Sequence, residues 1–144
     1  MALHLVKLCV GVSSVEELVA WIDWRLDEKR RLGEVAEQKH TTRMVPKRAA
    51  DLLDGGSLYW VIKGNVQIRQ ELIDIRPFTD REGIQRCDLV LHPKPVLTQW
   101  QPRRAFQGWR YLTAEDAPRD LGGGKGANAL PPHLRAELAE LGLL

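Results

Sequence analysis

The chain contains 144 residues, the size of a single domain that can bury about two-thirds of its unfolded surface. Its hydrophobic fraction of 44% and charged fraction of 28% are typical of a folded soluble protein, and its net charge of +2 is too small to indicate a polyanionic partner. No apolar run approaches the roughly 20 residues of a membrane span. Two cysteines, Cys9 and Cys87, cannot build a disulfide framework. We expect one cytoplasmic domain, residues 1–144, with buried free thiols and no membrane contact.

Residues 3–10 are rich in leucine and valine and predict a first strand that ends at Gly11. Two serines, each followed three residues later by a glutamate, then predict a capped helix start within residues 13–17. Apolar residues follow at helical spacing and form one stripe: Val15, Leu18, Val19, Ile22 and Leu26. Trp24 lies about 180° from this stripe. Its ring therefore requires a second partner: another part of the chain, a second copy of the chain, or a stacked ligand.

Short elements and turn signals alternate in the middle of the chain. Residues 46–54 predict a short helix, with a proline near its start and two glycines just past its end. We expect a tight turn at Gly64-Asn65, and a β-bulge near Gln70, where the alternation of apolar and polar residues slips. The segments that predict strands are 57–63, 66–75, 84–92, 96–101 and 105–112.

The last part of the chain differs in composition. Residues 122–130 are rich in glycine and predict a flexible loop, and residues 131–141 carry leucines on one face and predict a C-terminal helix. Several short strands at close spacing indicate an antiparallel meander. The expected fold class is α+β, a small antiparallel β-barrel or strongly bent sheet of about five to six strands with flanking helices.

Two segments without a single acidic residue carry much of the positive charge. Residues 39–50 and residues 89–114 each contain four lysines and arginines, although the whole chain carries only +2. Within the second segment, residues 103–111 (RRAFQGWRY) combine arginines that fit phosphate with rings on which bases stack. If the two segments meet in space, they form an electrostatic binding face. Otherwise the rings are core residues and the arginines are merely solvated.

Two further motifs are ambiguous. Residues 39–43 are dense in hydrogen-bond donors and include His40, which suits an acid–base centre, a phosphate-gripping loop or a solvated loop before a helix. Arg69 lies within an apolar strand and either pairs with Glu71 or Asp74 or reads a ligand in a cavity. The sequence completes no phosphate-loop, nucleophile-elbow or metal-binding motif, so neither a cofactor nor a metal is indicated.

Five segments carry a resemblance to a known family: LVKL (5–8), HTTR (40–43), PKRA (46–49), GGSLYWVIKG (55–64) and RAFQGWRY (104–111). On them the whole chain resembles a bacterial domain-of-unknown-function family of about this length (DUF1489-like), which implies no particular activity. A second similarity, to PUA-like domains including the ASCH and EVE-type modules, rests on a helix and glycine-rich turn before Trp60, Gly64 and Arg69. It implies a small bent barrel with flanking helices that often binds RNA or modified bases.

Three functions remain open. The first is an RNA-binding module without catalysis, which binds RNA or a nucleotide-like anion. Its candidate binding residues are Arg43, Lys47, Arg48, Trp60, Arg69, Arg103, Arg104, Trp109, Arg110 and Tyr111. The second is a structural or partner-binding protein, with Trp24 or the C-terminal helix in an interface that could be that of a homodimer. The third is a small enzyme for a phosphorylated or nucleotide ligand, with His40 as its acid–base group and Arg43, Arg69 and Arg104 as an anion clamp.

Overall fold

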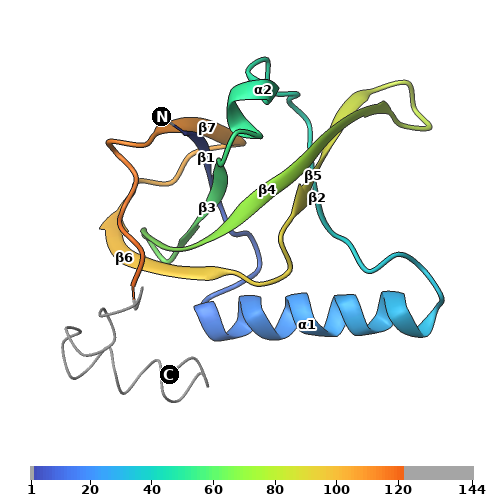
Figure 1. Cartoon of the computed structure of the whole chain (residues 1–144), viewed down its shortest axis with the longest axis horizontal. Coiled ribbons are helices and arrows are strands. Elements are labelled where there is room, and N and C mark those ends of the chain that lie inside the picture. The colour runs from blue at the N-terminus through green and yellow to red at the C-terminus, as the bar shows by residue number, and fades with distance from the viewer. Residues whose placement is uncertain (1, 122–144) are drawn as a thin grey trace.

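The computed structural model describes residues 2–121, which form one seven-stranded sheet with two helices (Figure 1). The expected α+β class is confirmed, and the predicted C-terminal loop and helix lie outside the described residues. The strands are β1 (Leu3–Leu8), β2 (Gln38–Thr42), β3 (Ser57–Ile62), β4 (Asn65–Thr79), β5 (Gln85–Leu91), β6 (Val96–Pro102) and β7 (Trp109–Thr113). The helices are α1 (Val15–Arg31) and α2 (Ala49–Leu52).

The sheet is open and mixed. Its strand order is β2-β5-β4-β3-β1-β7, and β6 pairs with the first part of the long strand β4. Each neighbouring pair is antiparallel except β1 and β3, which are parallel. The prediction of a closed barrel or a pure meander is wrong, because the chain leaves β1 through α1 and reaches β2 at the opposite edge before it returns to β3. Parallel neighbours require such a crossover connection.

Helix α1 begins where the sequence predicts. The Ser14 hydroxyl oxygen accepts a hydrogen bond of 3.1 Å from the backbone N–H of Glu17, whose carboxylate accepts one of 3.1 Å from the backbone N–H of Ser13. The helix buries a single stripe of residues: Val15, Leu18, Ile22 and Leu26. Neither described helix has the length and hydropathy needed to cross a membrane.

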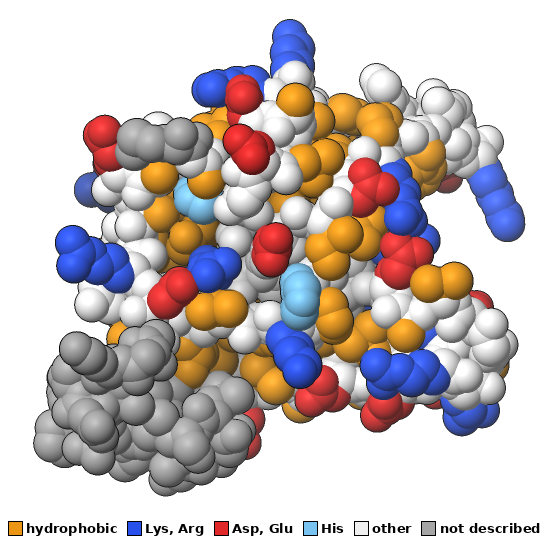
Figure 2. All heavy atoms as spheres, in the orientation of Figure 1, with side chains coloured by type: hydrophobic (Ala, Val, Ile, Leu, Met, Phe, Trp, Pro, Cys, Tyr) orange, Lys and Arg blue, Asp and Glu red, His pale blue; other side chains and the backbone are white. Residues whose placement is uncertain are grey.

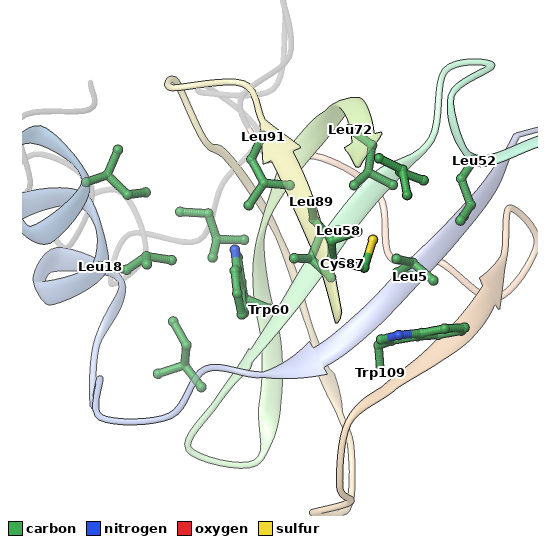
Figure 3. Packing of buried hydrophobic residues seen from close by; sticks show 14 of the residues in the cluster. Leu5, Leu18, Leu52, Leu58, Trp60, Leu72, Cys87, Leu89, Leu91 and Trp109 are labelled. Carbon is green, nitrogen blue, oxygen red and sulfur yellow. The ribbon is translucent and has the colours of Figure 1, made fainter. Parts of the chain in front are cut away.

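The core has two parts, because side chains along each strand alternate between the two faces of the sheet. The larger part packs the inner face, which we define as the face toward α1 and α2, and Trp60 lies there between Leu18 of α1 and the leucines of the sheet (Figure 3). The opposite, outer face carries a smaller cluster closed by Phe106 and Ala117. Its buried members are Val6, Tyr59, Val61, Val66 and Leu112.

Two local predictions are corrected. Lys63 and Gly64 have φ values of 50° and 80°, the signs of a type I′ hairpin turn, and Ile62 pairs with Asn65. The turn is therefore Lys63-Gly64, one residue earlier than predicted. The register shifts lie on either side of Gln70, between residues 66 and 68 and between residues 72 and 74.

The side chain of Gln70 explains why its position looks irregular in the sequence. Its amide oxygen accepts a hydrogen bond from Trp60 Nε1 at 2.9 Å, and its amide nitrogen donates one to the His92 carbonyl oxygen at 2.9 Å. Gln70 is fully buried on the inner face. A polar residue thus occupies an inward position without any break in the local pairing of the strand.

Candidate nucleic-acid interface

The two acid-free segments of the sequence lie against each other in the structure. Trp109 Nε1 donates a hydrogen bond to the carbonyl oxygen of Met44 at 3.0 Å. The backbone N–H of Arg48 donates one to the Tyr111 hydroxyl oxygen at 3.2 Å. Residues 44–48 are thereby held on strand β7, which forms one end of the strand order.

We call the exposed side chains at this junction the β7 surface: Arg43, Lys47, Arg48, Arg110 and Tyr111. Tyr111 keeps 37% of its surface exposed. Asp51 pairs with Arg48 at 3.0 Å and offsets its charge, whereas Arg43, Lys47 and Arg110 form no ion pair with any described residue. The surface therefore offers fixed positive charges beside one accessible ring.

Because successive side chains of β7 point to opposite faces of the sheet, these groups lie on both faces. Trp109 and Tyr111 share one face, and Arg110 lies on the other, where its guanidinium sits 5.6 Å from the ring centre of Phe106. A cation stacked on a ring in this way is held in a defined position. The edge of the sheet thus carries arginine on both faces.

Trp109 and Trp60, two of the predicted stacking rings, are buried. Trp109 is 6% exposed and contacts Tyr111 edge-to-face with ring centres 4.9 Å apart. Trp60 is 4% exposed. Both indole N–H groups are satisfied inside the protein, by Met44 and by Gln70. Trp109 therefore packs against the Tyr111 ring and is not itself accessible to a base, and Trp60 belongs to the inner core.

The remaining predicted arginines have other surroundings or no described contact with this junction. Arg69 lies on the outer face and donates two hydrogen bonds, of 2.8 and 2.7 Å, to the carboxylate of Asp120. The predicted pairing with Glu71 or Asp74 is therefore wrong. Arg69 also lines a hollow of about 340 Å³. Arg103 donates its backbone N–H to the Gly64 carbonyl oxygen at 2.8 Å. Arg104 is exposed in the loop before β7. The structure thus gathers the residues of 43–48 and 109–111, and it places Arg69 in a different site, the hollow on the outer face.

His40 lies on the inner face of β2, a strand that the sequence did not predict. Its ring meets Trp60 edge-to-face, with centres 4.9 Å apart. Burial, followed by the nearby charges of Lys7 and Arg25, lowers the pKa of His40 to about 4. The imidazole is therefore neutral at pH 7, whereas an acid–base group is most effective with a pKa near the working pH.

Helix α1 presents Trp24 away from the core, as the sequence predicts. Trp24 is 63% exposed and Trp21 is 43% exposed, and the guanidinium of Arg25 lies 5.0 Å from the Trp21 ring centre. Within residues 2–121, no other segment covers Trp24. Figure 2 shows acidic and basic side chains interspersed on the face that it draws, without one continuous basic field.

The fold and the β7 surface define an α+β protein with a basic, aromatic sheet edge. The family model described as proteins of unknown function, DUF1489, matches residues 5–144, so the chain belongs to this family. No curated protein and no solved structure matches it. The predicted resemblance to this family is confirmed, and the resemblance to PUA-like domains gains no support from any match.

Proposed function

We propose that this protein is an RNA-binding module that holds single-stranded RNA along the β7 surface. The observation that carries the proposal is the junction of two distant acid-free segments through Trp109–Met44 and Arg48–Tyr111. Planar arginine groups bind phosphate oxygens in pairs, and an exposed tyrosine ring accepts a stacked base.

The positions of the cations suggest a path for the RNA backbone. Arg43, Lys47 and Arg48 come from the segment that packs beside Tyr111, and Arg110 lies on the other face of β7. A backbone that follows the sheet edge meets cations on both sides of one stacking ring.

Binding of a fluorescent, mixed-sequence single-stranded RNA, measured by anisotropy at low salt, tests the stacking role. Loss of the Tyr111 ring in Tyr111→Ala is expected to weaken binding about 5- to 150-fold, the value of one base stack. Tyr111→Phe keeps the ring and loses the bond to Arg48, and we expect binding within about threefold of wild type. Trp100→Ala is the matched control, because Trp100 is a half-exposed ring on β6 outside the β7 surface.

The role of the cations is tested with two double variants that have the same net charge. The double variant Arg43→Gln/Lys47→Gln removes two cations from the β7 surface, and Arg30→Gln/Arg81→Gln removes two from α1 and the β4–β5 turn. We expect the first pair to weaken binding and the second to leave it nearly unchanged. Equal losses from both pairs, or no binding of any RNA by the wild type at low salt, would rule out the β7 surface as an RNA site.

A second candidate function is partner binding through α1, because Trp24 is 63% exposed. A homodimer formed through this ring would appear in light scattering at twice the monomer mass, and Trp24→Ala would restore the monomer. A wild-type protein that is monomeric at all concentrations would leave this candidate without support.

A further inference from the structure

A cavity of about 420 Å³ opens where β1 ends, on the inner face, and its lining shares no residue with the β7 surface. Its walls come from β1 and the loop that follows it, from α1, from β2 and from Trp60 of β3, and β1 and β2 are far apart in the strand order. Helix α1 lies across this end of the open sheet (Figure 1). The volume lies within the range of roughly 300–1,000 Å³ that is typical of small-molecule sites.

Aromatic and apolar side chains form much of the lining. Trp21 contributes from α1 and remains 43% exposed, and Trp60 contributes from β3 beside Leu18 (Figure 3). A half-exposed tryptophan at the mouth of a cavity is costly to keep in water but favourable against a planar ligand. Of the two rings, Trp21 is the accessible one, and it suits a flat, conjugated group.

The charge at the cavity is positive. Lys7 lines it, and the charges of both Lys7 and Arg25 act on His40 in the opposite wall. No aspartate or glutamate is among the residues of the lining. Among the described residues, no carboxylate forms an ion pair with Lys7 or Arg25. The site therefore attracts an anion and repels a cation.

Two buried polar atoms of the β2 wall have no partner. Gln38 Oε1 and His40 Nε2 make no hydrogen bond within the described part of the chain, although Gln38 is only 3% exposed. Buried polar groups in folded proteins are nearly always paired, and each exception requires an explanation. Both residues line the cavity, so these unpaired atoms belong to its wall.

We propose that this cavity binds one nucleotide, with its base against the exposed part of Trp21 and its phosphate beside Lys7. Ring carbonyl and amino groups then face Gln38 and His40, and the phosphate lies at the positively charged mouth. The site is separate from the β7 surface, and it does not depend on RNA binding there.

Titration with the four ribonucleoside monophosphates, followed by tryptophan fluorescence and calorimetry, tests the proposal. We expect at least one of them to bind, and its nucleoside and ribose 5-phosphate to bind at least about tenfold more weakly, because each lacks one half of the recognised group. Trp21→Ala and Lys7→Gln are expected to weaken binding about tenfold or more. Trp24→Ala is the matched control, since Trp24 lies on the same helix, is exposed and does not line the cavity.

A thermal melt with and without nucleotide checks that each variant folds. The variant Arg43→Gln/Lys47→Gln separates the two proposed sites, because we expect it to bind the mononucleotide as the wild type does. Weaker mononucleotide binding by that variant, with Trp21→Ala unchanged, would overturn the cavity proposal while leaving the β7 surface in place. The absence of binding by all four nucleotides at millimolar concentration would also overturn it.

Discussion

The indole N–H of Trp109 donates a hydrogen bond to the backbone carbonyl oxygen of Met44 over 3.0 Å, although the two residues are 65 positions apart in the sequence. Trp109 is 6% exposed, so the bond is largely shielded from water. Inside a protein such a bond is strong and its loss is costly. It joins two segments that carry the charge of the β7 surface.

Replacement of Trp109 by phenylalanine is expected to lower the free energy of unfolding by about 1–3 kcal/mol, because the Met44 carbonyl loses its buried donor. Urea denaturation measures this change. Trp100→Phe, on an exposed ring, is the control and should have little effect. Equal stability of Trp109→Phe and wild type would show that the junction does not depend on this bond.

Gly56 is required by close packing rather than by its backbone angles. A Cβ atom at this position would lie 2.2 Å from the Leu3 carbonyl oxygen and 2.3 Å from the Leu52 carbonyl oxygen. Gly56→Ala should destabilise the protein by about 1–3 kcal/mol or prevent folding, because backbone atoms must move. Gly64→Ala has open space around its Cβ and only a positive φ, so we expect a smaller cost of about 1–2 kcal/mol. Chemical denaturation that ranked the two in the reverse order would contradict this explanation.

His40 makes stability depend on pH in a defined direction. Its pKa falls from 6.5 to about 4 on folding, so the unfolded chain binds the proton more tightly. The free energy of unfolding therefore has its full value above pH 6.5 and falls as the pH drops toward 4. Between pH 7 and pH 5, the wild type should lose about 1–2 kcal/mol more than His40→Gln. Urea midpoints at the two pH values measure the difference, and identical losses would contradict the shift.

Cys9 lines the cavity at the end of β1, and we expect its thiol to react slowly. Burial raises its pKa to about 11, so little thiolate exists at pH 8. In a Cys87→Ala background, alkylation of Cys9 in the folded protein should be about 100-fold slower than in urea at the same pH. Equal rates in the two conditions would show that the thiol is neither buried nor shifted.

The sequence predicts most elements with strong local signals. The capping serine and the apolar stripe of α1 are visible in residues 14–26, and β3 is an apolar run. Strand β2 was missed because its five residues, QKHTT, contain no aliphatic or aromatic side chain. Its pairing with β5 and the hydrogen bond of 2.7 Å from Thr41 to Asp88 hold it in place, and these are contacts across 47 residues.

The candidate sites, like the strands and helices, could be predicted from the sequence only where the signal is local. Composition identifies the two acid-free segments, but only the tertiary fold brings Met44 beside Trp109. Burial of Trp60 and Trp109 was not predictable, because a ring that stacks bases and a ring that fills a core have the same sequence pattern. The cavity was not predictable either, since it needs the end of β1 and the far strand β2 to face each other across α1.

The salt dependence of RNA binding tests the central claim most directly. If each of the four cations of the β7 surface contacts one phosphate, the logarithm of the association constant should fall against the logarithm of salt concentration with a slope of about −3. Arg43→Gln/Lys47→Gln should reduce the magnitude of that slope by about 1.4, and Arg30→Gln/Arg81→Gln should leave it unchanged. A wild-type slope near zero, or the same slope in Arg43→Gln/Lys47→Gln as in the wild type, would contradict phosphate binding by the β7 surface.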